Sequence, residues 1–235
     1  MLKVAPILFA LVYGYVYYRF SAWRLARELD EQSKLLQDPE LGVITDKMAA
    51  ALDLAAIKVH IYDVEPINGL AAPDGRIFIT RGFYEKFKAG AVSAEEIATV
   101  IAHELGHVAL GHARRRMIDF SGQNAIRVAL GMVLGRILPG IGGWIAGILT
   151  SLLAARLSRK DEFEADAYAA ALLTKTGIGV GPQVSLFEKL DALAGQGVRP
   201  PAWLMSHPKT EKRIEAIEAL ARSWDDAPLK PGPKS

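Results

Sequence analysis

The apolar and polar positions of the first residues predict a membrane anchor. Residues 4–18 carry no charge, and the apolar stretch reaches Trp23 if Arg19 extends its charged end towards water. This length is close to the ~20 residues that a helix needs to cross the hydrocarbon core of a bilayer. We therefore expect residues 1–23 to form a single uncleaved span. Aromatic residues crowd its C-terminal end, as in the interfacial belt of membrane helices: Tyr13, Tyr15, Tyr17, Tyr18 and Trp23.

The charges on either side of this segment predict its orientation. Lys3 precedes it, whereas Arg24 and Arg27 follow it, so the positive-inside rule places the rest of the chain in the cytoplasm. A cleaved signal peptide and a buried N-terminal helix are the alternatives for the same segment. The signal peptide lacks a good cleavage site, because Phe20 stands where a small residue is needed before Ala22.

After the anchor, the period of the apolar positions changes twice. Residues 24–54 have a helical period that is broken at Asp38–Pro39, so two helices are expected in this juxtamembrane segment. Residues 57–62 alternate with a period of two, and a second alternating run at 76–80 follows the turn sequence Pro73-Asp74-Gly75. These two runs predict a small antiparallel sheet.

Helical patterns dominate the second half of the chain. Ser93 and Glu96 form a capping box, which predicts an amphipathic helix that continues to about Arg116. A second long helix is expected over residues 151–176, and a last helix begins near Pro208.

Between the two long helices, residues 137–155 are uncharged but rich in glycine and proline. We expect an apolar hairpin that lies against the membrane or over a site, with a second transmembrane helix as the alternative. The chain is thus predicted to be a mostly helical α+β protein, with one domain over residues 55–224. A tail rich in proline and lysine, residues 225–235, is expected to be disordered.

The composition narrows the possible functions. Hydrophobic residues make up 51% and charged residues 23% of the 235 residues, which excludes a disordered chain and a transporter with many spans. The net charge of +2 provides no polybasic surface, so nucleic acid is not expected as a partner. The chain has no cysteine, which excludes disulfides, thiolate zinc sites and a cysteine nucleophile.

One pattern inside the capped helix has the spacing of a metal site. His103, Glu104 and His107 follow the pattern H-E-x-x-H. At about 100° per residue, the two imidazoles lie about 40° apart on one helix face, where they can share a metal. Glu104 lies about 60° beyond His107, near enough to reach a metal-bound water and too far round the helix to be a ligand.

A catalytic zinc needs a third protein ligand and an open position for water. Without cysteine, the candidates are carboxylates and distant histidines. Glu162 and Asp166 stand at i and i+4 on one face of the second long helix. Glu162 can therefore bind the metal while Asp166 orients a ligand histidine.

The remaining histidines receive other assignments. His60 lies on the polar side of a strand, and His112 points about 140° away from His107 at an arginine-rich helix end, so both are assigned to structure or surface. His207 precedes Pro208. It is either a helix-start residue without a catalytic duty or a donor that stabilises the tetrahedral oxyanion or reaches the open zinc position.

These residues resemble the membrane-associated metallopeptidases of family 48, which include CAAX prenyl endopeptidases, HtpX-type heat-shock proteases and Oma-type quality-control proteases. The resemblance covers roughly residues 68–217. Besides H-E-x-x-H, four pieces carry it in the same order: Asn68–Pro73, Ile77–Gly82, Ser158–Arg159 leading to Glu162-x-x-x-Asp166, and Ser206–Pro208 before Arg213–Ile214.

The resemblance implies one zinc ion per chain, held by His103, His107 and Glu162. It also implies that Glu104 is the general base and that Asp166 lies beside a ligand histidine. The expected reaction is peptide hydrolysis, in which Glu104 takes a proton from the attacking water and delivers it to the leaving amine.

In a metallopeptidase, an edge strand beside the zinc helix binds the substrate backbone by strand addition. Residues 77–80 are one candidate for this strand. The other, which we take as the substrate-binding segment, consists of Asn68, Gly69, Leu70 and Ala71. The family usually has an Asn-Ala-Phe-like stretch where this chain has Asn68-Gly69-Leu70.

We therefore expect a membrane-anchored zinc endopeptidase that cleaves unfolded or membrane-associated proteins, with protein or peptide substrates and membrane lipid as partners. One alternative is a zinc-bearing chaperone or adaptor that binds chains without cutting them. The other is a prenyl-peptide endopeptidase, disfavoured because the chain has too few long spans to enclose a lipid-bearing substrate. The sequence does not indicate an oligomeric state.

Overall fold

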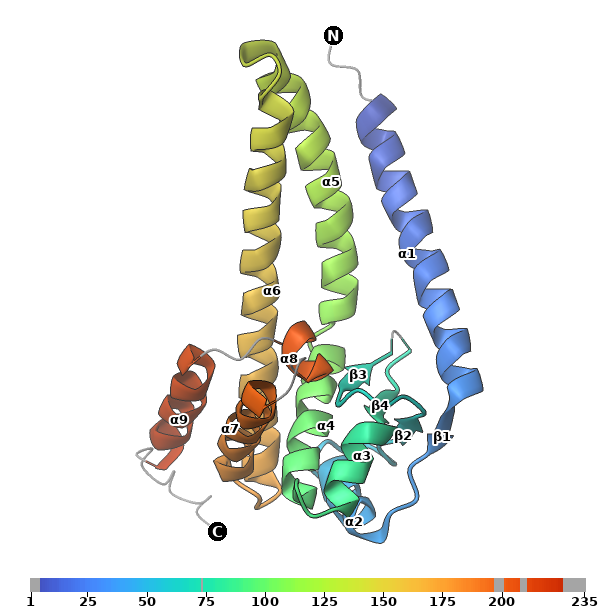
Figure 1. The fold of residues 1–235 in the computed structure, drawn as a ribbon, viewed down its shortest axis with the longest axis vertical. Helices are drawn as coiled ribbons and strands as arrows, with labels where there is room; N and C mark the ends of the chain where they lie inside the picture. The colour runs from blue at the N-terminus through green and yellow to red at the C-terminus, as the bar shows by residue number, and fades with distance from the viewer. Residues whose placement is uncertain (1–4, 73, 197–200, 208–210, 226–235) are drawn as a thin grey trace, which may run out of the picture.

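A computed structural model describes residues 5–72, 74–196, 201–207 and 211–225 of the chain. Within these residues, a mainly helical domain with one sheet forms one end of the molecule, and three long helices extend away from it (Figure 1). The elements follow in the order α1 (Ala5–Gln32), β1 (Ser33–Leu35), α2 (Pro39–Ala51), β2 (Val59–Tyr62), β3 (Gly69–Ala71), β4 (Ile77–Thr80), α3 (Arg81–Lys88), α4 (Ala94–Ala109), α5 (His112–Ile137), α6 (Gly142–Lys175), α7 (Gly181–Gln196), α8 (Ala202–Ser206) and α9 (Glu211–Asp225).

The sheet is mixed, so the prediction of an antiparallel sheet was wrong. Its strand order is β1-β2-β4-β3, with β2 and β4 parallel and the two outer pairs antiparallel. The turn before Arg76 joins β3 to β4 rather than β2 to β4. Because β4 inserts between β2 and β3, it pairs in parallel with β2, and β3 becomes an edge strand.

α4 is the central element of the domain. All of its residues from Glu96 to His107 are buried, between β3 and β4 on one side and α6 and α7 on the other. The predicted capping box at its start is confirmed, because the Glu96 N–H donates to Ser93 Oγ and the Ser93 N–H donates to the Glu96 carboxylate. α4 ends at Ala109 rather than near Arg116.

The long helices α5 and α6 form a hairpin. α6 begins at Gly142, earlier than the predicted residue 151, and includes most of the glycine-rich segment 137–155. The turn between α5 and α6 lies at the end of the molecule remote from the sheet (Figure 1). The hairpin was predicted to lie either against the membrane or over a site. Its tip does not cover the centre of the domain, so the second of these positions is wrong.

α1 runs beside this hairpin and packs along α5. Its C-terminal part enters the domain, where Leu29 packs against Ala72 and Phe78. No helix within the described residues has both the length and the hydropathy required of a membrane span. Residues 1–4 of the predicted anchor and residues 226–235 of the predicted tail lie outside the described part of the chain.

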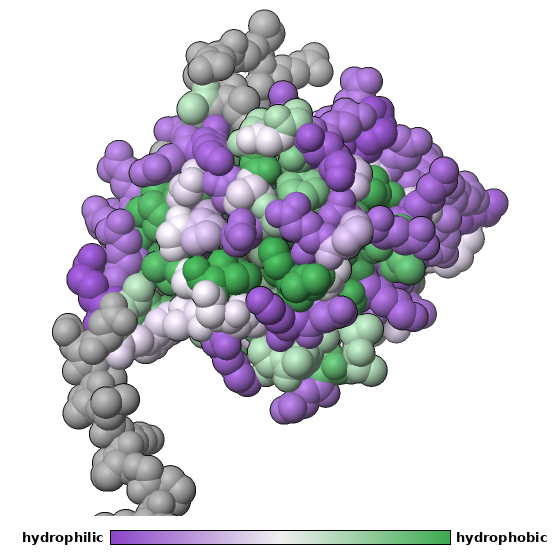
Figure 2. Space-filling model, turned by 90° about the horizontal axis from the view of Figure 1, so that it is seen from below, coloured by the Kyte–Doolittle hydropathy of each residue, from purple (hydrophilic) through white to green (hydrophobic). Residues whose placement is uncertain are grey.

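The two ends of the molecule differ in surface character. At the end opposite the hairpin tip, hydrophilic residues surround smaller groups of apolar ones (Figure 2). Large apolar side chains are exposed along α1 and near the hairpin tip, among them Phe9, which is 71% exposed, and Trp144, which is 72% exposed. Exposed apolar side chains of this size are unusual on a protein surface in contact with water and indicate an interaction surface on the long helices.

Candidate metal centre

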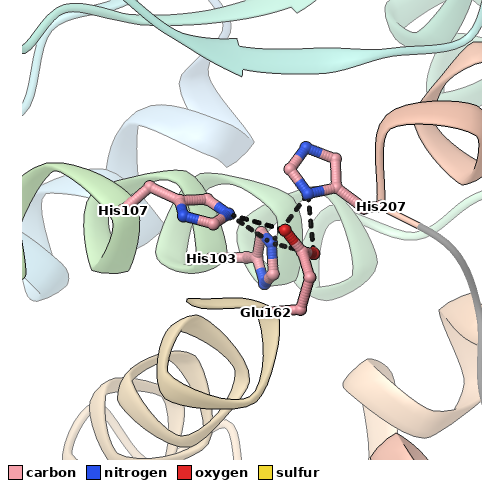
Figure 3. A group of neighbouring side chains, drawn as sticks. All are labelled: His103, His107, Glu162 and His207. Atoms are coloured by element: carbon pink, nitrogen blue, oxygen red, sulfur yellow. Dashed lines mark hydrogen bonds and ion pairs between the residues drawn. The ribbon is translucent and has the colours of Figure 1, made fainter. Parts of the chain in front are cut away.

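Two helices and the end of a third bring four ligand atoms together. α4 supplies His103 and His107, α6 supplies Glu162, and His207 follows α8. All four side chains are buried, and one ligand atom from each lies within 4.8 Å of the others. Figure 3 shows the three imidazole rings arranged around the Glu162 carboxylate.

The distances between these atoms fit a tetrahedral ion. The Nε2 atoms of His103 and His107 are 3.1 Å apart, and each lies 3.5 Å from an oxygen of Glu162. Zinc bonds of ~2.0–2.1 Å place neighbouring corners of a tetrahedron about 3.3 to 3.4 Å apart. His103, His107 and Glu162 therefore have the donor chemistry and the spacing of three zinc ligands.

His207 lies at the fourth corner of the same group. Its Nδ1 atom is 3.3 Å from His103 Nε2 and 2.8 Å from Glu162 Oε2. Its Nε2 atom is 3.4 Å from Glu104 Oε1. Of the two alternatives for His207, this position favours a role at the site, because His207 and Trp203 of α8 both contact the His103 ring.

Asp166 holds the outer side of the His103 ring. The Nδ1 atom of His103 is 3.0 Å from Asp166 Oδ1, so its N–H donates to the carboxylate when Nε2 faces the metal position. Arg213 donates two hydrogen bonds to the same carboxylate, from Nε to Oδ2 at 2.6 Å and from Nη2 to Oδ1 at 2.8 Å. The orientation that the sequence predicted for Asp166 is consistent with this arrangement, and Arg213 adds a buried countercharge.

The charges around these groups perturb their pKa values. Burial lowers the pKa of His103, but hydrogen bonds from its ring to Asp166 and Glu162 outweigh burial and raise this pKa to about 9. Burial raises the pKa of Glu162, but His103 and His207 more than offset this and lower it. Burial likewise raises the pKa of Asp166, while Arg213 and His103 lower it overall. The cluster therefore keeps both carboxylates ionised, which suits a cation.

Glu104 lies beside the four ligand atoms without being one of them. Glu104 is 2% exposed, and its Oε1 atom, which lies 3.4 Å from His207 Nε2, has no hydrogen bond among the described residues. An ionisable oxygen that is buried without a hydrogen bond is costly in a stable fold and is expected where a reactant completes the site. A general base would have to lie at such a position, and this role of Glu104 stays a prediction.

A cavity of about 370 Å³ opens next to Glu104. Its lining includes the four predicted substrate-binding residues, Asn68 to Ala71, together with His107 and His207. β3 carries three of them and lies against α4. Gly69 makes this approach possible, because a Cβ atom there would lie 2.3 Å from Val100 Cγ1.

The surface position that was one of the two expectations for His112 was wrong. It is 1% exposed, and its Nδ1 atom lies 2.6 Å from Nδ1 of His107. The assignment assumed a continuous helix, but α4 ends at Ala109 and Gly111 has a φ of 67°, so the chain turns before α5 begins at His112. The glycine was the available sequence signal, since a left-handed residue at this point ends a helix. His60 lies in β2 and is not part of the cluster.

Comparisons with known proteins agree with this geometry. The model of the family described as Peptidase family M48 matches residues 35–221, which is most of the chain. The chain belongs to peptidase family M48. The metalloprotease LoiP of Escherichia coli K12 is 28% identical to this M48 peptidase over 177 residues, which cover 75% of the chain and 68% of LoiP.

Two further relatives carry protease names. The protease HtpX of Pseudomonas paraeruginosa PA7 is 26% identical over 234 residues, covering 83% of this chain and 77% of HtpX. The human mitochondrial metalloendopeptidase OMA1 is 26% identical over 171 residues, covering 69% of this chain and 32% of OMA1. The M48 peptidase described here is thus a metalloendopeptidase, with peptides or proteins as substrates and side chains able to hold a metal ion.

Proposed function

We propose that the protein is a zinc endopeptidase in which His103, His107 and Glu162 hold the ion. The observation that carries the proposal is the set of three ligand atoms at tetrahedral separations beside Glu104 Oε1, a buried oxygen without a hydrogen bond among the described residues. Bound zinc supplies a Lewis acid that polarises the scissile carbonyl and makes water a stronger acid. All other steps fall to side chains of the chain itself.

Glu104 is proposed as the general base and acid. Its Oε1 atom, which has no hydrogen bond among the described residues, accepts a proton from the attacking water, and the same carboxyl group then delivers this proton to the leaving amine. His207 is proposed to stabilise the tetrahedral oxyanion beside the open position of the site, because its two nitrogens face Glu162 and Glu104. Asp166 and Arg213 hold His103 in place during the reaction.

The substrate backbone is proposed to add to β3. This strand is at the edge of the sheet and lines the cavity next to Glu104, so an extended peptide can use its free backbone groups. Asn68, Gly69, Leu70 and Ala71 would then fix the register of the scissile bond. Strand addition needs an unfolded segment, which supports misfolded proteins as substrates and hence a role in protein quality control.

Membrane association is proposed from the exposed apolar residues of the long helices. Phe9 and Trp23 on α1 and Trp144 on α6 are more than half exposed, and aromatic side chains of this kind suit the lipid interface. The purified protein should float with phosphatidylcholine vesicles in a density gradient. The double variant Phe9→Ser, Trp144→Ser should float to a smaller extent. Unchanged flotation of this variant would contradict a role for these side chains.

The main test compares two glutamates of α4. The full chain should digest β-casein, a loosely folded protein, and a chelator should stop digestion until zinc is restored. Glu104→Gln should keep the bound zinc but lower kcat by ~10²–10⁴-fold, the usual contribution of a general base. Glu95→Gln is the matched control, because Glu95 is exposed on the first turn of the same helix. Zinc binding without digestion by the unaltered chain would support the chaperone alternative instead.

A further inference from the structure

His107 and His103 differ in the group that contacts the Nδ1 atom of each ring, on the side away from Glu162. His103 donates directly to the carboxylate of Asp166. The Nε2 atom of His107 faces Glu162 (Figure 3), and its Nδ1 atom lies 2.6 Å from Nδ1 of His112. The outer neighbour of this ligand is therefore a second imidazole rather than a carboxylate.

The distances define one arrangement of protons when Nε2 of His107 binds an ion. Nδ1 of His107 must then carry the proton, so it donates and Nδ1 of His112 accepts. A neutral His112 that accepts at Nδ1 carries its own proton on Nε2. That atom lies 3.1 Å from Glu164 Oε2 and 3.9 Å from Asp161 Oδ1, so its N–H is directed at an acidic pair on α6.

The backbone makes this contact specific. His112 is five residues beyond His107 and on a continuous helix would point about 140° away from it. Gly111, with a φ of 67° and a ψ of 30°, interrupts the helix and turns His112 back, so that the two ring centroids are 4.9 Å apart. Both rings are buried.

We propose that His112 is a positioning residue, which fixes the tautomer and ring orientation of His107 and links it to the carboxylate of Glu164. This inference rests on the proposed zinc site. Groups that orient a metal-bound histidine typically change metal affinity or activity by ~10–100-fold when they are removed. The relay also ties α4, α5 and α6 together at the ligand, whereas Asp166 and Arg213 tie α4 to α6 and α9.

The test measures zinc affinity of the full chain by competition with a chromophoric chelator, independently of activity. His112→Phe keeps a ring but cannot accept a hydrogen bond, and should weaken zinc binding by ~10–100-fold. His112→Asn should stay within a few-fold of the unaltered chain, because its amide oxygen can accept from His107. The same replacement elsewhere, His60→Phe, should leave the affinity unchanged.

The cobalt form adds a readout that a purely structural role would not move. The visible absorption of bound Co²⁺ should be altered in His112→Phe and restored in His112→Asn. If circular dichroism shows that His112→Phe is unfolded, Glu164→Ala takes its place and should weaken zinc binding several-fold, since Glu164 is partly exposed and its loss spares the core.

Several outcomes would overturn the relay. One is an affinity of folded His112→Phe within twofold of the unaltered chain, with an unchanged cobalt spectrum. Another is a second zinc ion per chain that His112→Phe loses, which would make His112, Asp161 and Glu164 metal ligands in their own right. If the unaltered chain binds no zinc, the proposed function fails first, and that result is distinct from an effect confined to His112 variants.

Discussion

The glycine within the H-E-x-x-H pattern controls how closely the two ligand helices approach each other. A Cβ atom on Gly106 would lie 3.1 Å from the Cα and carbonyl oxygen of Ala165 and 3.1 Å from Cβ of Tyr168. These atoms belong to the backbone of α6 or lie next to it, so no side-chain rotation can move them. Gly106→Ala should therefore push α6 away from α4 by a few tenths of an ångström.

Two opposing effects set the stability of this variant. Replacing glycine by alanine inside a helix stabilises it by about 1 kcal/mol, whereas overfilling a packed core costs ~1–3 kcal/mol. The free energy of unfolding should thus fall by up to about 2 kcal/mol. Glu162 lies one turn before Ala165 on α6, so the same shift moves a ligand oxygen. Because metal sites tolerate deviations of only ~0.2 Å, we expect zinc affinity to fall about tenfold.

Urea unfolding and chelator competition measure these two quantities. Gly42→Ala is the matched control, because Gly42 also lies in a helix and a Cβ atom there has nothing within 4 Å. The control should be stabilised by up to about 1 kcal/mol with unchanged zinc affinity. If Gly106→Ala is stabilised like Gly42→Ala and binds zinc as tightly as the unaltered chain, the contact between Gly106 and α6 does not limit the spacing of the two helices.

Three other substitutions test separate parts of the structure. Gly69→Ala should raise KM, because the added Cβ atom displaces β3 from Val100. The second change Val100→Ala should return KM towards its original value. An unchanged KM in the single variant would contradict the substrate role of β3. Arg213→Met leaves Asp166 without its buried countercharge. In a urea titration, the free energy of unfolding should therefore fall by ~3–5 kcal/mol. A loss below about 1 kcal/mol would show that the ion pair contributes little. Burial raises the pKa of Asp38, but hydrogen bonds to its carboxylate more than offset this and hold the pKa below its ordinary value of 3.8, so its charge stabilises the fold above that pH and loses this effect as the pH falls. Asp38→Asn should therefore be about 1 kcal/mol less stable than the unaltered chain at pH 7, with a difference that shrinks towards pH 3, and a constant difference would contradict the assignment.

The metal site could be predicted in large part because its information is local. A capping box fixes the start of α4, and two histidines four residues apart on a helix share a face whatever surrounds them. The i, i+4 spacing of Glu162 and Asp166 follows the same rule on α6. Helix geometry thus singled out the two histidines and a candidate carboxylate, the family resemblance completed the predicted ligand set, and neither could show that the two helices meet.

The tertiary structure decided the features that depend on chain direction and on neighbours far away in sequence. Strand pattern predicted β2 and β4 but missed β1, which lies in a segment expected to be helical. It also did not predict that β4 inserts between β2 and β3, since pairing partners are not encoded in a period of two. The turn at Gly111 changed the neighbours of His112 completely, because one left-handed residue redirects everything that follows. The position of Arg213 on the Asp166 carboxylate arises only when α9 packs against α6.

By itself, the sequence determined which residues share a helix face, where α4 starts, and which two imidazoles and which carboxylate are candidates for a metal site. Such properties follow from the fixed rise and rotation of a helix, which act within a few residues. Only the folded structure decided that α4 and α6 meet closely at Gly106, that β3 lies at an edge of the sheet beside α4, and that His112 contacts His107. Those contacts depend on the packing of segments distant along the chain, and packing is a property of the whole domain.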